Sequence, residues 1–313
     1  MKHDIPFSVA PFHQTNWDWR AAGNFIGGGS GTGLLLFAAL AAGPAYRVQA
    51  AAALVMIAAG LTCVWLEIGK PLRAINVFRH PQTSWMTREG LVSLVLFPAG
   101  LAALVLGGGS PAAWISAALA MLFLYCQMRI LLASRGIPAW REPRLGALII
   151  ATALAEGCGW AALVAAAFGD ETTSSLAAAL IAAAVLRAWG WRAYLGGLRA
   201  RGAPVKALAV LERCDRTFLL AGSALPAILA AAGLVLGSPW PGAAAGLAAA
   251  LAGWWIKYVI VARAAYNQGF ALPALPVRGV GVPGPAVQPG WSTGAAAGAP
   301  AAEPPKPGNP RHA

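Results

Sequence analysis

Residues 145–168, LGALIIATALAEGCGWAALVAAAF, contain a single charged side chain, Glu156. A helix that crosses a lipid bilayer needs about 20 consecutive, mostly apolar residues, and a charge at its centre costs about 2.5–3.5 kcal/mol on insertion scales. Soluble domains carry about a quarter charged residues, whereas this 313-residue chain is 11% charged and 58% hydrophobic. The stretch therefore predicts a transmembrane helix, and the composition predicts that most of the chain is built in the same way.

Further apolar runs occupy residues 19–43, 50–68, 91–106, 112–132, 176–195, 218–236 and 243–261. We therefore predict an all-α integral membrane protein with eight transmembrane helices, which form one domain over residues 19–268. Residues 1–18 lack the apolar core of a signal peptide, and we expect them to be a short cytoplasmic segment. Residues 269–313 are rich in Pro, Gly and Ala; this composition predicts a disordered tail, with a tether for a partner protein as the alternative.

Basic residues alternate between the connections. The second, fourth and sixth connections each carry several Lys or Arg, whereas the first carries Arg47 alone and the third, fifth and seventh carry none. With eight helices, the even connections share one side with both termini, and the positive-inside rule makes that side cytoplasmic. We therefore expect a multi-pass protein of the bacterial inner membrane with cytoplasmic termini. Because this sorting accounts for the net charge of +12, we do not expect nucleic-acid binding.

Histidine and cysteine, which usually bind haem, iron–sulfur clusters and other metals, do not occur at the positions that such sites require. The histidines lie outside the apolar runs, at His3, His13, His80 and His312. A haem in the membrane needs histidine ligands within the helices, so no haem is expected. The cysteines, Cys63, Cys126, Cys158 and Cys214, form no CxxC pair, so neither an iron–sulfur cluster nor another metal site is expected, and buried thiols are the prediction.

A run of small residues, GGGSGTG at 27–33, lies inside the first apolar stretch. It offers no GxGxxG frame and follows no strand, so a phosphate loop is not predicted. Small residues at this spacing let helix backbones approach closely, and close packing is the favoured interpretation. A flat surface for a ring-shaped ligand is the alternative.

Ionisable side chains inside a membrane are functional candidates. Glu156 lies near the middle of its run, and Arg187 and Lys257 lie within the sixth and eighth runs. Glu156 could pair with a basic group on a neighbouring helix, or it could transfer protons. Arg187 is expected to extend its long side chain toward the basic end.

The second connection is the most informative one. It reads WLEIGKPLRAIN at 65–76 and TSWMTRE at 83–89. Trp85 suits a membrane interface, and Glu89 falls in the first turn of a helix, where the helix dipole favours a carboxylate. Arg88 and Glu89 could equally face a cleft and hydrogen-bond a quinone or quinol. Composition leaves both interpretations open.

At this connection the sequence resembles the DmsC-type membrane anchors of molybdopterin oxidoreductases, within the wider NrfD and polysulfide-reductase anchor superfamily. The likeness is carried by Glu67-Ile68-Gly69, Pro71, Arg73-Ala74, Asn76 and the stretch 84–89. Three further stretches agree: 27–33, Tyr125 with 138–140, and 257–270. The last is similar to anchors of the phenylacetyl-CoA:acceptor oxidoreductase type. The resemblance covers roughly residues 15 to 280.

The resemblance implies eight helices in two four-helix bundles, and a non-catalytic subunit with no haem or iron–sulfur cluster of its own. It implies that menaquinone or ubiquinone binds near the face that docks an iron–sulfur, ferredoxin-like subunit. That subunit would relay electrons to or from a molybdopterin catalytic subunit. Because the connection with the motifs lies on the basic side, we expect these partners in the cytosol, and substrate oxidation with quinone reduction is the favoured direction.

The resemblance also implies a quinone site. Its carboxylate matches Glu89, its tyrosine matches Tyr125, and a polar residue of the first helix approximately matches Asn24; Arg88, Trp85 and Glu67 complete the predicted site. Glu67 stands where the family often has His, which leaves the quinone type and the role of this residue in proton transfer open. Two other function classes stay open: a secondary transporter, although no convincing internal repeat is visible, and a structural anchor without a quinone site.

Overall fold

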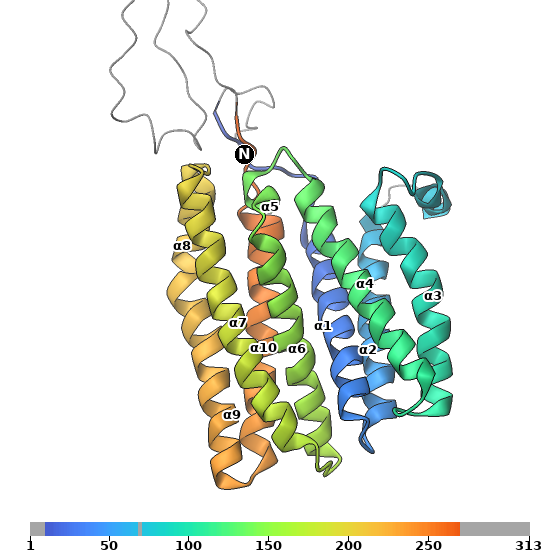
Figure 1. Ribbon diagram of the computed structural model, residues 1–313. Coiled ribbons are helices and arrows are strands. Elements are labelled where there is room, and N and C mark those ends of the chain that lie inside the picture. Colours follow the sequence, from blue (N-terminus) through green and yellow to red (C-terminus); the bar gives the residue numbers. More distant parts are fainter. Residues whose placement is uncertain (1–9, 68–70, 270–313) are drawn as a thin grey trace, which may run out of the picture.

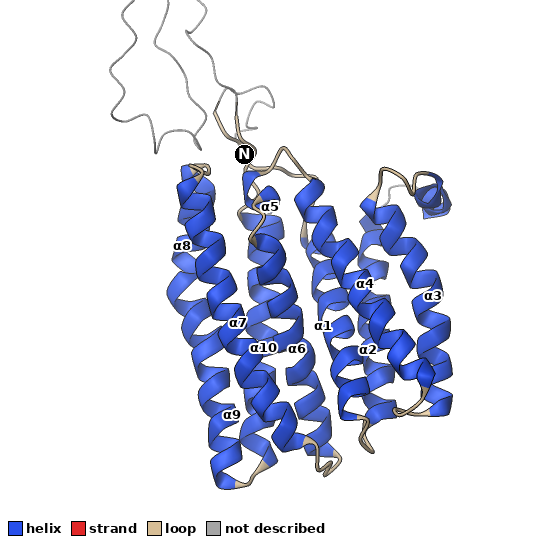
Figure 2. Cartoon of the chain, viewed as in Figure 1, coloured by secondary structure: helices blue, strands red, loops and turns tan. Residues whose placement is uncertain are grey.

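The computed structural model describes residues 10–67 and 71–269. Within these ranges every regular element is helical, and the isolated bridge between His13 and Tyr266 is the one β-type pairing. Figure 2 shows the long helices lying side by side with their axes roughly aligned. The motif residues Ile68 and Gly69 and the predicted tail from residue 270 onward lie outside the described residues.

Eight spans are long and apolar enough to cross a membrane in the described part of the chain. This confirms the predicted multi-pass membrane fold. Six spans are single helices: α1 (Trp19–Ala41), α2 (Tyr46–Glu67), α3 (Trp85–Leu106), α4 (Pro111–Ala133), α6 (Leu145–Ala167) and α7 (Thr173–Ala200). The seventh joins α8 (Val205–Leu219), η2 (Leu220–Ala224) and α9 (Leu225–Leu236), and the eighth joins α10 (Pro239–Tyr258) and η3 (Val259–Arg263). Two short helices, η1 (Pro71–Arg79) and α5 (Pro138–Arg141), lie in connections.

The helices form two four-helix bundles, as predicted. In the first, α1 packs on α2 and α4, and α3 packs on α4; in the second, α6 packs on α7 and α10, and α9 packs on α7 and α10. The bundles meet along α1 and α6 (Figure 1). Because α1 and α6 have the most buried spans, at 67% each, this seam is the interior of the molecule.

The predicted helix ends are wrong at the sixth connection. Arg213 and Arg216, expected in a loop, belong to α8, and the connection is reduced to residues 201–204. Charged residues end the apolar run but do not end the helix, because backbone hydrogen bonding continues past the hydrocarbon. The second and third helices likewise begin earlier than predicted, at Tyr46 and Trp85.

All of the strongly basic connections lie at one end of the molecule, together with both described ends of the chain (Figure 1). There the backbone amide of Phe12 donates to Asn267 Oδ1 at 2.8 Å, which ties the first described residues to the last. At the opposite end, the buried Asp170 accepts hydrogen bonds from the amides of Ala45 and Thr172. The predicted sorting of charge between the two ends is therefore confirmed.

The small-residue run of α1 brings helix backbones together. A Cβ at Gly27 would lie 2.5 Å from the carbonyl oxygen of Met56 on α2, and a Cβ at Gly31 would lie 2.5 Å from that of Ala53. On another face, a Cβ at Gly33 would overlap the backbone of Ala153 on α6. The packing interpretation is confirmed, and it explains how α1 lies between two bundles.

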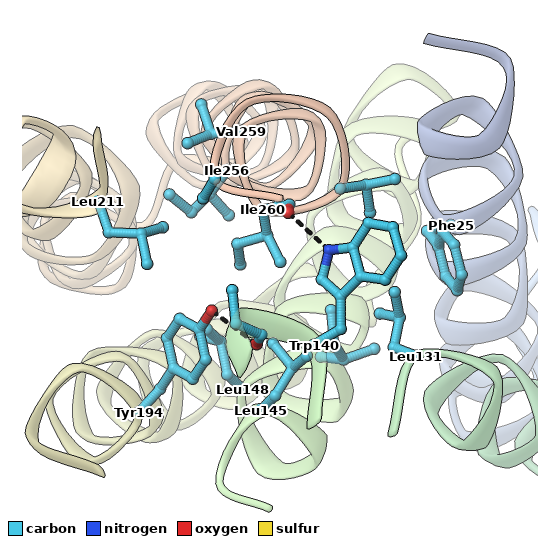
Figure 3. Packing of buried hydrophobic residues seen from close by; sticks show 14 of the residues in the cluster. Phe25, Leu131, Trp140, Leu145, Leu148, Tyr194, Leu211, Ile256, Val259 and Ile260 are labelled. Carbon is cyan, nitrogen blue, oxygen red and sulfur yellow. Dashed lines mark hydrogen bonds between the residues drawn. The ribbon is translucent and has the colours of Figure 1, made fainter. Parts of the chain in front are cut away.

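The hydrophobic core consists of two clusters, one toward each end of the helices. One cluster, drawn in Figure 3, lies toward the end with the termini and includes Phe25 and Trp140. The other lies toward the opposite end and includes Leu34 and Phe123. Between them runs a layer of buried polar side chains from several helices: Ser30, Gln127, Glu156, Arg187 and Lys257. Polar groups at this depth have to be satisfied by each other, so this layer is a natural place to look for function.

Candidate functional site

A pocket of about 410 Å³ lies between α2, η1 and α3, near the end with the termini. Its lining residues are Leu61, Val64, Trp65, Ile75, Val77, Phe78, Met86, Glu89, Gly90 and Ser93. Most of these side chains are apolar, and Glu89 is the one charged residue among them. The volume falls in the range of small-molecule sites, about 300–1,000 Å³.

The Glu89 carboxyl is held by neutral groups. The residue is 3% exposed, and Asn24 Nδ2 of α1 donates to its Oε1 at 3.1 Å. Gln127 Nε2 of α4 donates in turn to the backbone oxygen of Asn24 at 2.9 Å. Among the described residues no Lys or Arg forms an ion pair with Glu89. A carboxyl in this setting can exchange a proton and a hydrogen bond with a molecule in the pocket.

The structure places three predicted site residues in a separate cluster on α3 and α4. The guanidinium of Arg88 lies 4.1 Å from the Trp85 ring and donates to the carbonyl oxygens of Pro81 and Gln82. Trp85 also makes an edge contact with Tyr125, which is 39% exposed. None of Trp85, Arg88 and Tyr125 lines the pocket. The cluster fixes the α2–α3 connection rather than the interior of the pocket.

Glu67 lies at the end of α2 and is also absent from the pocket lining. The charges that act on it are those of Asp18 and Arg20, at the start of α1. Asp18 caps α1, and its hydrogen bonds with Arg20 hold the pKa of its carboxyl below the usual range. Of the six residues predicted for a quinone site, the structure thus brings Glu89 and Asn24 into contact at the pocket, gathers Trp85, Arg88 and Tyr125 in a second cluster, and leaves Glu67 outside both.

Several lining residues were not singled out from the sequence. Leu61, Val64 and Trp65 are spaced i, i+3, i+4 on α2, and Met86, Glu89 and Ser93 are spaced i, i+3, i+7 on α3. Each set lies on one helix face. This spacing was the available signal, but in a helix that is apolar all round it does not distinguish a pocket face from a lipid face.

A second buried carboxyl, Glu156, lies at the seam of the two bundles. Lys257 Nζ and Ser30 Oγ each approach its Oε2 at 2.7 Å, and Trp254 Nε1 donates to Ser30 Oγ at 2.8 Å. The predicted pairing with a basic group on a neighbouring helix is therefore confirmed. Glu156 and Lys257 are both fully buried.

Arg187 does not extend to the basic end, so that prediction is wrong. It is 0% exposed, its Nη1 donates to the backbone oxygen of Ala249 at 2.8 Å, and its guanidinium lies 5.5 Å from the Phe218 ring. The negative charge of Glu156 lies close enough to act on it. These contacts hold the cation inside the second bundle.

The cysteines are unpaired: Cys126, Cys158 and Cys214 are buried, as predicted, whereas Cys63 is half-buried. In the described part of the chain no three His, Cys, Asp or Glu side chains come together as a metal site would require.

No protein-family model matches the chain, and a search of curated proteins finds no match either. The resemblance to DmsC-type anchors therefore depends on the sequence motifs alone. The pocket at Glu89 and the buried charged centre at Glu156 are features of the structure itself and do not depend on the resemblance.

Proposed function

We propose that this protein is the quinone- or quinol-reactive membrane anchor subunit of a multi-subunit molybdopterin oxidoreductase, and that the Glu89 pocket binds the quinone head. The observation that carries the proposal is one buried carboxyl in an otherwise apolar pocket between membrane helices. Quinol oxidation releases two protons with two electrons, and quinone reduction takes them up. The ligand therefore needs apolar walls for its ring and tail and a proton-exchanging group at its oxygen.

The neighbours of Glu89 support this assignment. Asn24 orients the carboxyl by a hydrogen bond, Gln127 holds Asn24 through its backbone oxygen, and no cation fixes the group as a carboxylate. In addition, Asn24 Oδ1 and Gln127 Oε1 are buried with no hydrogen-bond partner. Glu89 would accept or donate the proton, whereas Asn24 and Gln127 would position it. Trp65 and Phe78 would flank the ring.

The proposed partners follow from the resemblance and from the charge at one end. The pocket lies at the basic end, where an iron–sulfur subunit would dock and exchange electrons with the bound quinone. The Trp85, Arg88 and Tyr125 cluster lies near that end and would contribute to docking, as would Glu67. The positive-inside rule makes this end cytoplasmic, so the proposed complex faces the cytosol from the bacterial inner membrane. A C-terminal fusion reporter that gave a periplasmic signal would contradict this orientation.

The binding test compares two carboxyls at the same end of the molecule. Purified protein in detergent is titrated with a short-chain quinone, and quenching of tryptophan fluorescence reports binding next to Trp65. Glu89→Gln should weaken binding about tenfold, corresponding to one lost hydrogen bond to a charged or proton-exchanging group, about 1.4 kcal/mol. Glu67→Gln, which changes a carboxyl outside the pocket, should leave binding unchanged. Ser93→Phe should abolish binding by filling the pocket.

Equal binding by all four proteins would identify a structural anchor without a quinone site. A secondary transporter is the second candidate, because the charged centre at Glu156 lies at the meeting of two bundles, where transporters hold their substrates. Uptake of a solute by proteoliposomes that contain this chain alone would favour the transporter.

A further inference from the structure

The centre at Glu156 contains more positive than negative charge. Glu156 of α6, Arg187 of α7 and Lys257 of α10 are all 0% exposed, and these are the charged groups that act on Lys257. From α1, Ser30 donates a hydrogen bond to Glu156 and does not titrate, and η2 and α9 carry no charged residue. With all three groups ionised, the centre would hold one unbalanced positive charge. A net charge at this depth is strongly disfavoured.

Lysine is the group that can remove this imbalance. A guanidinium stays protonated in proteins, whereas a buried lysine readily loses its proton. If Lys257 releases one proton, the remaining Glu156 and Arg187 balance each other. If it is protonated, the 2.7 Å contact with Glu156 Oε2 stabilises the ammonium. The centre therefore has two states that differ by one proton, and each has a physical reason to be populated.

Unpartnered polar atoms surround the centre. Glu156 Oε1 and the Nε and Nη2 atoms of Arg187 are buried and have no hydrogen-bond partner. Thr152 lies one helical turn from Glu156 toward the basic end. Its Oγ1 is also buried and has no hydrogen-bond partner. A site built only to lock two helices would satisfy these atoms. Here Glu156 Oε1 and Thr152 Oγ1 provide the next positions for a proton that leaves Lys257, whereas the guanidinium nitrogens of Arg187 are donors only and cannot accept it.

The backbone around the centre makes room for these groups. A Cβ at Gly29 of α1 would overlap Lys257 Nζ, and a Cβ at Gly253 of α10 would overlap the Glu156 carboxyl. On the adjacent residue of α1, a Cβ at Gly28 would overlap the Gln127 amide. The glycine run thus admits polar side chains from both bundles at consecutive positions of one helix.

We propose that Glu156, Arg187 and Lys257 form a proton-exchange site at the seam of the two bundles. Lys257 takes up and releases one proton there, while Arg187 stays charged. On release, the Nζ–H bond breaks and the proton passes to Oε2 of the Glu156 carboxylate, 2.7 Å away. Rotation of the protonated carboxyl brings the proton to the Oε1 side, where Thr152 Oγ1 accepts it and passes its own hydroxyl proton on toward the basic end. Lys257 is then a neutral amine, and Glu156 is again a carboxylate. The proposal does not depend on what binds in the Glu89 pocket.

The test observes Lys257 directly in the full-length protein. The chain is labelled with ¹⁵N at its lysine side chains in detergent, and the Lys257 signal is assigned as the one that Lys257→Arg removes. Between about pH 6 and pH 10 the signal should change reversibly from the ammonium to the amine position. In Glu156→Gln, which removes the stabilising carboxylate, the amine form should appear at least one pH unit lower.

A signal that stays in one form across this range would overturn the proposal, because the pair would then be a fixed structural contact. If Glu156→Gln does not fold, Thr152→Val keeps all three charges and tests the exit route: exchange of the Lys257 protons with D₂O should slow several-fold. An unchanged exchange rate in Thr152→Val would contradict the route. Quinone binding measured on the same samples should be unaffected, so failure here is distinguishable from failure of the proposed quinone site.

Discussion

Glu89 and Glu156 are both carboxyls buried among membrane helices, but they differ in whether a cation is paired with them and in whether they border a pocket. Glu89 is oriented by the Asn24 amide and borders an open pocket, whereas Glu156 is paired with a lysine and sealed between the bundles. A carboxyl without a cation is free to respond to a molecule beside it. A carboxyl with a cation is fixed until a proton moves. A glutamate is thus suited to binding a ligand at position 89 and to exchanging a proton with a lysine at position 156.

The largest expected effect comes from unbalancing the sealed centre. Glu156→Gln leaves Lys257 and Arg187 without the carboxylate that balances them, and breaking a buried pair by removing one partner costs about 3–5 kcal/mol. We expect a strong loss of unfolding free energy, measured by denaturant titration in detergent micelles. Lys257→Met leaves Glu156 and Arg187 to balance each other and should therefore cost much less. If Glu156→Gln and Lys257→Met were equally destabilised, the charge balance would not be the source of the effect.

Separating the bundles should have the next largest effect. Gly33→Ala places a Cβ against the Ala153 backbone, and overpacking of this kind costs about 1–3 kcal/mol. Gly196→Ala on α7 is the matched control, since its added Cβ would meet no atom within 4 Å apart from the adjoining backbone of its own helix. Thermal unfolding of the two variants should show a lower Tm for Gly33→Ala alone.

At the pocket, the loss of one hydrogen bond should be smaller and should depend on the ligand. Asn24→Ala removes the donor to Glu89 Oε1, and leaving a buried acceptor unsatisfied costs about 1–3 kcal/mol. We expect a modest fall in stability together with weaker quinone binding. Unchanged quinone affinity in this variant would show that Asn24 does not position the carboxyl for the ligand.

The smallest effect on stability is expected at Asp18, which lies outside the membrane. Because its side chain is partly exposed to solvent, Asp18 serves as a comparison for the two buried carboxyls. Its folded pKa is depressed by Arg20, so its contribution is present above the unfolded pKa and is lost as pH falls through the folded pKa. Because the side chain is 41% exposed, solvent screening keeps the contribution below about 1 kcal/mol. Asp18→Asn should lower stability slightly near neutral pH and have no effect in strong acid. If Asp18→Asn lowered stability more in acid than at neutral pH, the folded pKa of Asp18 would be raised and not depressed.

The sequence was sufficient where a single physical rule decides the outcome. The scarcity of charge along 145–168 predicts a span, and the alternation of basic connections predicts the sides, whereas Glu89 became a candidate through the resemblance and not through a physical rule. It was insufficient where tertiary neighbours decide. The sequence did not show that Arg187 finds a carbonyl oxygen and Phe218 inside the bundle, or that Trp65 and not Trp85 lines the pocket. In helices that are apolar on all sides, periodicity does not reveal which face meets protein.

The most direct test of the central claim is to find where a quinone lies. A photoreactive quinone analogue is cross-linked to the purified protein, and the labelled peptides are mapped by mass spectrometry. The account predicts labels on the faces of α2 and α3 that line the pocket, at residues 61–65 and 86–93, and competition by unlabelled quinone should remove them. Labels concentrated on Tyr125 and α4, or spread evenly over the lipid-facing helices, would contradict it.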